Sequence, residues 1–243
     1  MASETNNKDK EYNLLKYKVL EIPDTILYIP NFISEQEEKD LLDHVYSAPK
    51  PKWTHLSNRR LQNWGSLPHP KGMIAENIPQ WLKIYTERIA ELEIFAGQTP
   101  NHILVNEYLS GQGIMPHEDG PLFYPTVTTI SLGSSTVLDF YHHLNQCNQT
   151  SLETTSSSLE DRHLTSIFLE PRSMIVVKDA MYESYLHGID ERQEDRITDK
   201  IANLSHCQDI NTGDIRSRTT RVSLTIRIVP KVLKNKLFFG KKA

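Results

Sequence analysis

Two amphipathic segments in the first hundred residues predict helices. In the stretch ISEQEEKDLLDHVYS, Ser34 is followed three residues later by Glu37, which is the pattern of a capping box at the start of a helix. Leu41 and Val45 then recur at helical spacing. A second helix is predicted over residues 79–95, where a proline precedes apolar residues of roughly helical period: Trp81, Leu82, Ile84, Tyr85, Ile89, Leu92 and Ile94.

From residue 102 onward the hydrophobic pattern changes to short runs rich in β-branched and aromatic residues. The runs are HILVNEYL, TVTTISLG, TVLDFYHHL, SIFLEPRSMIVVKD, YESYLHGI and TTRVSLTIRIV. Their lengths and the turn residues between them indicate antiparallel strands. We therefore expect a mainly β fold with flanking helices (α+β), in which the helices pack outside a β-sandwich or jelly roll.

Two polar stretches interrupt this strand pattern. Residues 142–165 are rich in Ser, Thr, Asn and Gln, and residues 189–217 are charged and poor in apolar residues. Both are expected to be long surface loops, each either a lid or a tolerated insertion. We expect a polar N-terminal tail over residues 1–20 and a single domain over residues 21–243 that includes both loops.

Composition narrows the class of protein. No apolar run among the 243 residues approaches the roughly 20 that a membrane-spanning helix needs, so no membrane association is expected. The start of the chain is polar, and Cys147 and Cys207 both lie in polar surroundings, which fits a reducing compartment. We expect a monomer located in the cytoplasm and nucleus.

Charge is distributed unevenly along the chain. The net charge is −4, yet the segment from Arg216 to Ala243 has nine Lys or Arg residues and no acidic residue. This basic end could bind an anionic ligand or polymer, or it could simply be a solvated tail.

The motif MPHEDG introduces the candidate chemistry. In an extended backbone, side chains two residues apart lie on one face, so His117 and Asp119 could hold one ion together. His187, in YLHGI at the end of a late run, is the best candidate for a third ligand. Two histidines and a carboxylate on one face leave three positions free on an octahedral metal, as non-haem Fe(II) requires. By themselves the three residues are weak support, and the same set can hold zinc.

The run RVSLTIR strengthens the metal hypothesis. In a strand, Arg221, Ser223, Thr225 and Arg227 project to one face and the apolar residues to the other. Two arginines facing the interior would be costly unless anions pair with them, and a dicarboxylate cosubstrate supplies such anions. In VNEYL, Asn106 and Tyr108 share a face and offer neutral donors to the same ligand. An exposed strand edge is the alternative.

Taken together, these pieces resemble the AlkB family of Fe(II)- and 2-oxoglutarate-dependent dioxygenases. The sequence has NEY, then HED, then a distant histidine and then RVSLTIR, in the order and with the residue types of that family. The stretches NEYLSGQGIMPHEDGPLFYPTVTTISLGSSTVLDFY and KPKWTHLSNRRLQNWGSLPHPKGM extend the resemblance over most of the chain.

The resemblance implies a double-stranded β-helix that binds Fe(II), 2-oxoglutarate and O2. It implies His117, Asp119 and His187 as iron ligands. It places the 2-oxoglutarate contacts at five positions: Asn106, Tyr108, Arg221 for the distal carboxylate, Ser223, and Arg227 beside the carboxylate nearer the metal. The implied reaction converts 2-oxoglutarate to succinate and hydroxylates an alkyl C–H bond. With an N-methyl substrate the product releases formaldehyde.

The resemblance does not identify the substrate, because Gly120-Pro121-Leu122 replaces the acidic residue with which better understood members read the base. The stretch before residue 80 would form a lid whose aromatic and cationic residues suit a flipped or single-stranded base: Trp53, Arg59, Arg60, Trp64, His69 and Lys71. The tryptophans could equally belong to the core. Three hypotheses remain: a demethylase of alkylated RNA or DNA, an oxygenase of protein side chains, and a non-catalytic reader of modified nucleic acid.

Overall fold

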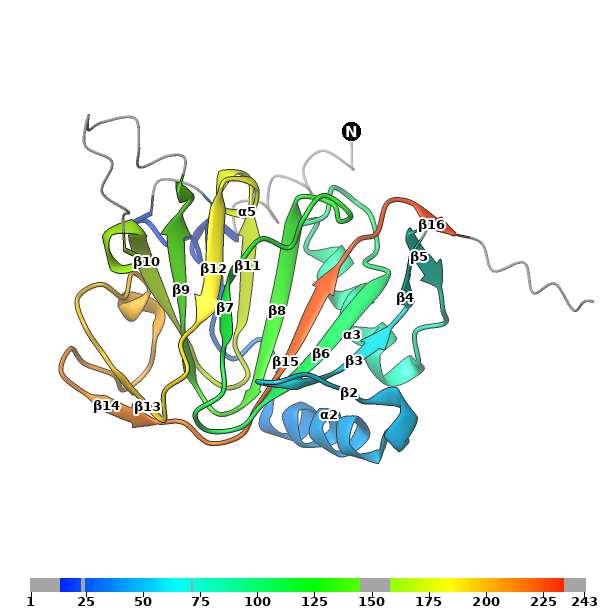
Figure 1. Cartoon of the computed structure of the whole chain (residues 1–243), viewed down its shortest axis with the longest axis horizontal. Coiled ribbons are helices and arrows are strands. Elements are labelled where there is room, and N and C mark those ends of the chain that lie inside the picture. The colour runs from blue at the N-terminus through cyan, green and yellow to red at the C-terminus, as the bar shows by residue number, and fades with distance from the viewer. Residues whose placement is uncertain (1–13, 23–24, 71, 145–157, 234–243) are drawn as a thin grey trace, which may run out of the picture.

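The chain folds into two β-sheets that face each other (Figure 1). The computed structural model describes residues 14–22, 25–70, 72–144 and 158–233. The large sheet has the strand order β1 (Ile26–Ile29), β11 (Met174–Lys178), β8 (Thr126–Gly133), β15 (Arg221–Arg227), β6 (His102–Tyr108), β3 (Arg60–Trp64) and β2 (Thr54–His55). The small sheet has the order β10 (His163–Leu169), β9 (Thr136–His142), β12 (Tyr185–Ile189) and β7 (Ile114–His117).

From β6 onward the chain passes repeatedly between the two sheets, and the pairings within each sheet are antiparallel. This is the double-stranded β-helix, or jelly roll, and it confirms the expected fold class. One apolar core lies between the sheets, where Phe140 and Ile167 of the small sheet pack with Ile26 and Ile175 of the large sheet. A cavity occupies the remaining space between the sheets.

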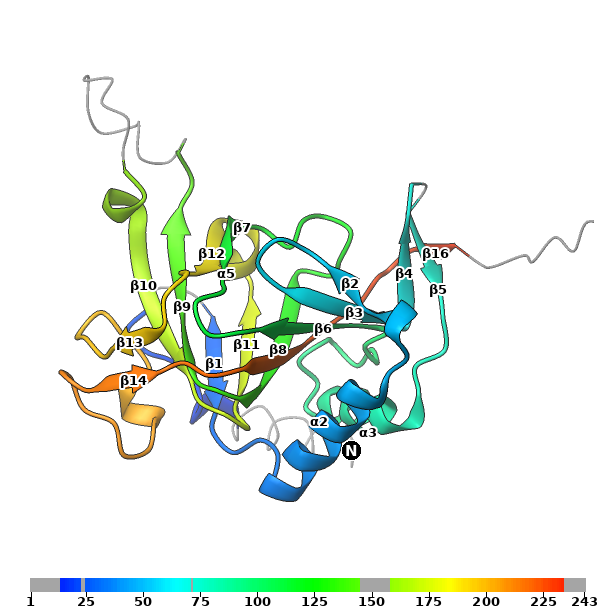
Figure 2. The same cartoon turned by 60° about the horizontal axis from the view of Figure 1, so that its bottom comes forward.

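Helices α2 (Glu35–Ser47) and α3 (Gln80–Glu91) cover the outer face of the large sheet (Figure 2). The predicted capping box is present: Ser34 Oγ accepts from Glu37 N–H at 3.2 Å, and Glu37 accepts from Ser34 N–H at 2.8 Å. Both helices pack with buried strand residues in the larger apolar core, including Leu41, Leu82, Val105 and Leu224. Helix α3 ends four residues earlier than predicted, because Glu93 adopts a left-handed backbone with φ 60°.

Strand β15 divides its side chains between two environments, as its alternation predicts. Val222, Leu224 and Ile226 enter the core beneath the helices. Arg221 and Arg227 face the other way, toward the space between the sheets. The same strand therefore anchors the helices and furnishes the cavity.

The ordered fold begins before residue 21, where the polar tail was expected to end. Lys18 forms a bridge with Leu27, and Tyr28 N–H donates to the Tyr17 carbonyl at 2.8 Å. Val19 is fully buried in the core between the sheets. Residues 17–19 thus pair with β1, and the buried side chain of Val19 holds them there.

The segment 189–217, expected as a loop poor in structure, forms a small folded unit. It contains β13 (Glu194–Arg196), the 3-10 turn η3 (Leu204–His206) and β14 (Ile215–Ser217), with β13 and β14 paired as a hairpin. Ile197 and Ile201 are buried and pack against Val137 and Phe168 on the outer face of the small sheet. Asn203 adds hydrogen bonds to the Phe168 backbone, so apolar burial and hydrogen bonds together dock the unit.

The other predicted loop is shorter at both ends than residues 142–165. Strand β9 extends to His142, and the turn η2 (Glu160–Arg162) leads into β10 at His163. Residues 145–157 lie outside the described residues. The remaining described elements are short: η1 (Lys50–Lys52), α5 (Ala180–Glu183), and a three-stranded sheet of β4 (Ser66–His69), β5 (Gly72–Ala75) and β16 (Val232–Leu233). None of the helices in the described ranges is long and apolar enough to cross a membrane.

Candidate active site

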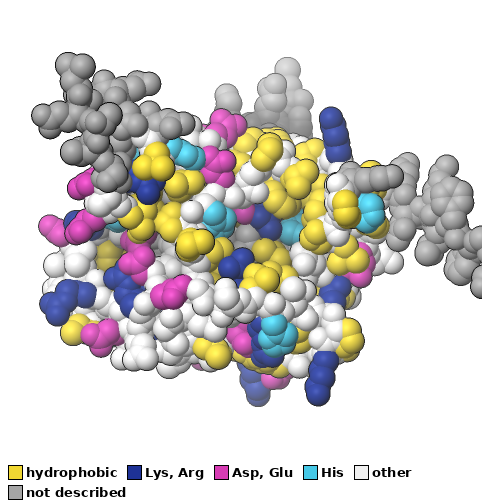
Figure 3. Space-filling view, in the orientation of Figure 1, with side chains coloured by type: hydrophobic (Ala, Val, Ile, Leu, Met, Phe, Trp, Pro, Cys, Tyr) yellow, Lys and Arg dark blue, Asp and Glu magenta, His cyan; other side chains and the backbone are white. Residues whose placement is uncertain are grey.

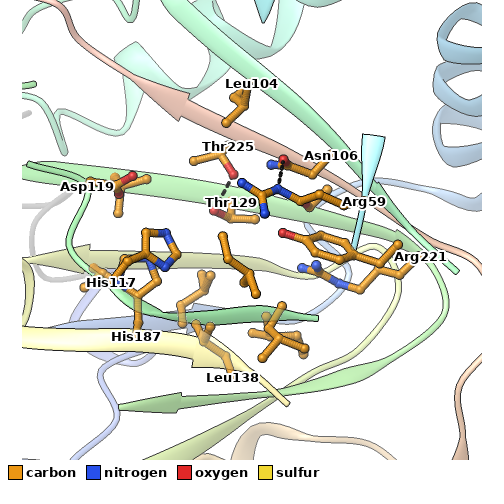
Figure 4. A pocket seen from close by; sticks show the side chains of 18 of the residues that line it. Arg59, Leu104, Asn106, His117, Asp119, Thr129, Leu138, His187, Arg221 and Thr225 are labelled. Atoms are coloured by element: carbon orange, nitrogen blue, oxygen red, sulfur yellow. Dashed lines mark hydrogen bonds between the residues drawn. The ribbon is translucent and has the colours of Figure 1, made fainter. Parts of the chain in front are cut away.

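A cavity of about 280 Å³ lies between the two sheets and brings together the polar residues singled out in the sequence. His117, Asp119 and His187 lie at one end of it, and Asn106 and Arg221 lie at the other (Figure 4). Viewed from outside, hydrophobic side chains surround a hollow near the centre of this face, with histidine and charged side chains among them (Figure 3).

The three candidate metal ligands converge although 70 residues of chain separate the two histidines. One donor atom from each of His117, Asp119 and His187 lies within 4.8 Å of the other two. The histidines are direct partners in the register of β7 and β12, and their ring centroids are 4.5 Å apart. Gly188 permits this pairing, because a Cβ there would lie 2.9 Å from the Pro116 nitrogen.

The ring of His117 is oriented by the backbone. Its Nδ1 lies 2.9 Å from the carbonyl oxygen of Met115, which can only accept a hydrogen bond. Nδ1 therefore donates to this carbonyl, and Nε2 is the nitrogen left to face a metal. This is the arrangement by which proteins fix a metal-binding histidine.

The electrostatics of the other two ligands also fit a cation. Asp119 accepts from Arg227 through Oδ1, whereas its buried Oδ2 has no partner among the described residues. Burial is the main cause that lowers the pKa of His187 to about 4, so the imidazole is neutral at physiological pH. A neutral imidazole and an orphaned carboxylate oxygen are the forms that coordinate a metal, so the donor set fits Fe(II).

At the far end of the cavity a buried arginine lacks an anionic partner. Arg221 is 4% exposed, and its Nη2 donates to Ser131 Oγ at 2.9 Å. Its Nε has no partner, and no carboxylate of the described residues pairs with it. Burial lowers its pKa to about 10, so the guanidinium remains charged at neutral pH. The site therefore has a positive charge available to an anionic ligand.

The neutral residues of this end come from neighbouring strands. Tyr108 is the register partner of Arg221, and Asn106 is the partner of Ser223. Tyr108, Asn106 and Ser223 are all buried and line the cavity. The sheet thus gathers into one cluster the residues that the sequence pattern placed on two separate strand faces.

Arg227 occupies a different position from Arg221. It pairs with Asp119, and its guanidinium carbon lies 3.9 Å from the centroid of the Phe123 ring. Its contact in the described structure is therefore with the candidate metal ligand itself. Phe123 covers this pair on one side, and Tyr182 Oη donates to the Gly120 carbonyl at 3.1 Å, which anchors the loop after Asp119.

The expected lid residues have divided roles. Arg59 lines the cavity, and its Nε donates to Asn106 Oδ1 at 3.3 Å (Figure 4). Trp53 and Trp64 instead pack against the larger apolar core, each beneath a cation. Neither tryptophan is among the described residues that line the cavity. Lys71 lies outside the described residues.

Sequence reasoning missed one buried residue beside the site. His102 is the register partner of Arg227, is 1% exposed, and has no hydrogen-bond partner for either ring nitrogen among the described residues. The only signal in the sequence was its place on the same strand face as Asn106 and Tyr108. His143 Nε2 lies 2.9 Å from Glu118 Oε1 and so draws that carboxylate to itself.

The fold and the site define a class of enzyme. Residues 51–227 match the sequence profile of the 2OG-Fe(II) oxygenase superfamily, and this range contains all the cavity residues described above. Members of that class use Fe(II) and 2-oxoglutarate, which agrees with the facial set of two histidines and one carboxylate.

Within that class, the chain belongs to the AlkB family. It is 54% identical over 230 residues to a Danio rerio protein named "Probable RNA/DNA demethylase ALKBH6", a match that covers 95% of this chain and 96% of that protein. It is 28% identical over 209 residues to "Uncharacterized protein L905" of Acanthamoeba polyphaga mimivirus, with 84% of each chain covered.

Solved structures agree on the fold. The structure of OsALKBH1 superposes with a TM-score of 0.52 at 14% identity, covering 84% of this chain and 96% of that one. An oxidoreductase of the 2OG-Fe(II) oxygenase family from Burkholderia pseudomallei gives a TM-score of 0.50 at 12% identity, covering 93% and 94%. At these identities the likeness concerns the double-stranded β-helix alone.

Proposed function

We propose that this chain is an oxidative demethylase of alkylated RNA or DNA. The observation that carries the proposal is its 54% identity, over nearly the whole chain, to a protein named as an RNA/DNA demethylase. The cavity supports it, because a metal-binding triad at one end and an unpaired buried arginine at the other suit a dicarboxylate cosubstrate.

In this proposal the residues of the cavity divide the work between metal and cosubstrate. His117, Asp119 and His187 hold Fe(II), and Arg221 binds the distal carboxylate of 2-oxoglutarate. Three further residues donate or position hydrogen bonds to the cosubstrate: Asn106, Tyr108 and Ser223. When bound, the metal, O2 and cosubstrate would supply the chemistry in which 2-oxoglutarate loses CO2 to become succinate and an N-methyl group is hydroxylated, after which its carbon leaves as formaldehyde.

The protein orients the metal ligands and keeps water away from the cosubstrate end of the cavity. The Met115 carbonyl fixes the tautomer of His117, and Arg227 holds one oxygen of Asp119 while leaving the other for the metal. Arg227 is in this view a residue that orients the ligand and lies beside the metal-proximal carboxylate. Burial of Arg221 and Tyr108 strengthens the ion pair that the cosubstrate would form, because water competes little there.

The surface beside the cavity suits a base removed from its stack. Leu56, Met115 and Leu122 are exposed, Met115 by 80%, and each lies within five residues of a residue that lines the cavity. Apolar side chains of this kind can contact the flipped base and its neighbours. Since Gly120 to Leu122 offer no carboxylate, base reading at these three positions would rest on shape and apolar contact.

A panel of methylated oligonucleotides tests the proposal. The purified protein is incubated with Fe(II), 2-oxoglutarate and single-stranded RNA and DNA that carry N-methylated bases, and formaldehyde is measured. We expect formaldehyde release that depends on the oligonucleotide and is abolished in His117→Ala. If no methyl group is lost across the panel while succinate forms with methylated peptides, the nucleic-acid proposal is wrong and a protein substrate replaces it.

A further inference from the structure

A third arginine enters the cavity from a different part of the fold than Arg221 and Arg227. Arg59 directly precedes β3, in the turn of the β2–β3 hairpin, and its side chain lines the cavity (Figure 4). Leu56 N–H donates to the Arg59 carbonyl at 2.9 Å, which closes the turn. The hairpin is the outer edge of the large sheet, so Arg59 reaches the cavity from its rim.

The contact that Arg59 makes is with a proposed cosubstrate residue. Its Nε donates to Asn106 Oδ1 at 3.3 Å. An amide side chain has one oxygen acceptor and one NH2 donor, so a guanidinium on the oxygen decides which way the amide points. With Oδ1 held by Arg59, the NH2 group of Asn106 is available to a ligand oxygen.

The positive charge of Arg59 also has no ion-pair partner among the described residues, whereas Arg227 pairs with Asp119. Burial raises the pKa of Tyr108, and the positive charges of Arg221 and Arg59 both oppose that rise, so Arg59 acts electrically at the Arg221 end of the cavity. A ligand carboxylate there would experience two cations.

A hydrogen bond links the tip of the β2–β3 hairpin to the segment that follows the small sheet. Asn58 Nδ2 donates to Glu191, which follows β12 and the candidate ligand His187. The turn that carries Arg59 therefore spans from the large sheet to the segment after the small sheet. Movement of this turn would carry Arg59 with it.

We propose that Arg59 is a positioning residue for the cosubstrate: it holds the Asn106 amide in the binding orientation, adds a cation at the Arg221 end, and so links 2-oxoglutarate binding to the position of the β2–β3 hairpin. The proposal rests on the cosubstrate half of the proposed function. It needs no nucleic acid, so it stands or falls separately from the choice of substrate.

The neighbouring arginine provides a matched control. Arg60 follows Arg59 in sequence but faces the other side of β3, where it makes two hydrogen bonds of 2.7 and 2.8 Å with the buried carboxylate of Glu107. It also stacks over Trp53 at 4.1 Å. Arg60 is thus a structural residue of the same hairpin, with the same charge and no contact with the cavity.

Calorimetric titration of 2-oxoglutarate into the Mn(II)-loaded protein, without nucleic acid, tests the positioning role. We expect Arg59→Gln to weaken 2-oxoglutarate binding by about tenfold or more, since hydrogen bonds to charged groups contribute about that much, and to leave the thermal midpoint unchanged. Arg60→Gln should do the reverse, lowering the thermal midpoint by leaving Glu107 unpaired while the affinity stays close to that of the wild type. Wild-type affinity in Arg59→Gln would overturn the proposal.

Two further measurements separate positioning from a general loss of charge. In a double-mutant cycle, Arg59→Gln should weaken binding much less when Asn106→Ala is already present; fully additive effects contradict the link through Asn106. In hydrogen exchange, 2-oxoglutarate should protect residues 54–64 of the wild type and not of Arg59→Gln. Equal protection in both proteins would show that the cosubstrate stabilises the hairpin without Arg59. If Arg59→Gln does not fold, Arg59→Lys, which keeps the charge but loses the planar donor, replaces it in each measurement.

Discussion

His102 is an uncharged histidine enclosed next to the charged pair of Arg227 and Asp119. Its ring lies 5.4 Å from that of Phe123, and neither nitrogen finds a hydrogen bond among the described residues. Burial, with a further contribution from Arg227, lowers its pKa to about 3. The residue therefore stays neutral in the folded protein at a pH where an unfolded chain would protonate it.

This histidine predicts a pH dependence of stability with a definite sign. Above pH 6.5 neither the folded nor the unfolded state protonates His102; below it only the unfolded state does, so stability falls as pH falls toward 3. Between pH 7 and pH 5 the free energy of unfolding should fall by about 2 kcal/mol because of His102 alone.

Urea unfolding of the metal-free protein at the two pH values measures the cost. His102→Leu should lose about 2 kcal/mol less than the wild type between pH 7 and pH 5. His55→Leu, which changes an exposed histidine, should behave as the wild type. Equal losses in wild type and His102→Leu would mean that His102 is protonated in the folded state.

Arg221 carries a second prediction at the scale of one side chain. Replacing it with glutamine removes the only buried cation of the described cavity that lacks a protein partner for its charge, and should weaken 2-oxoglutarate binding by about 2–3 kcal/mol. Titration calorimetry on the Mn(II)-loaded protein measures this. Arg216→Gln, in the exposed pair with Asp214, is the control and should have no effect. Undiminished affinity in Arg221→Gln would remove Arg221 from the cosubstrate site.

At this scale the sequence was informative wherever a single strand decides the geometry. Alternation along β15 correctly put Arg221 and Ser223 on one face, and the spacing of His117 and Asp119 correctly put them together. It named Arg59 only as a lid residue and did not single out His102, because the contacts of both depend on other strands and on a hairpin turn. The pairing of Arg227 with Asp119 is likewise a product of tertiary structure.

Among the elements, the segment 189–217 connects the strand of His187 to the strand of Arg221. Its base is fastened by a buried ion pair in which Arg218 donates to both oxygens of Asp195 at 2.7 and 2.6 Å. Arg218 also donates to the Asp190 carbonyl at 2.7 Å. The two ends of the segment, and hence β12 and β15, are held together by this pair.

Breaking the ion pair should therefore be costly. Asp195→Ala leaves the guanidinium of Arg218 buried without its partner, and we expect a loss of about 3–5 kcal/mol in the free energy of unfolding. Asp199→Ala removes an exposed carboxylate of the same segment and should change stability by less than about 0.5 kcal/mol. Denaturant unfolding compares the two. A loss as small as that of the control would show that water solvates Arg218 in solution.

The elements themselves were predicted with uneven success. Long amphipathic helices carry enough periodic positions to be read directly, and both α2 and α3 were found, although the left-handed Glu93 ends α3 early. Strands β13 and β14 have three residues each, too few to show alternation, so the segment looked like a loop. Its folding depends on the burial of Ile197 and Ile201 against a sheet far away in sequence.

At the scale of the whole molecule, the site exists because the jelly roll returns distant strands to one register. His117 pairs with His187 across β7 and β12, and Arg221 lies opposite Tyr108 across β15 and β6. Local sequence patterns favoured a sandwich or jelly roll but could not supply these pairings. The resemblance to the AlkB family implied the fold and named the candidate residues, and the pairings themselves come from the structure.

The central claim is that this cavity removes methyl groups from nucleic acid by Fe(II)- and 2-oxoglutarate-dependent oxidation. The most direct measurement is mass spectrometry of the nucleosides of total RNA and total DNA before and after treatment with the protein, Fe(II) and 2-oxoglutarate. The account predicts the loss of at least one methylated nucleoside, matched by succinate formation and absent with His117→Ala. Unchanged nucleoside profiles with a fully metal-loaded protein would contradict it.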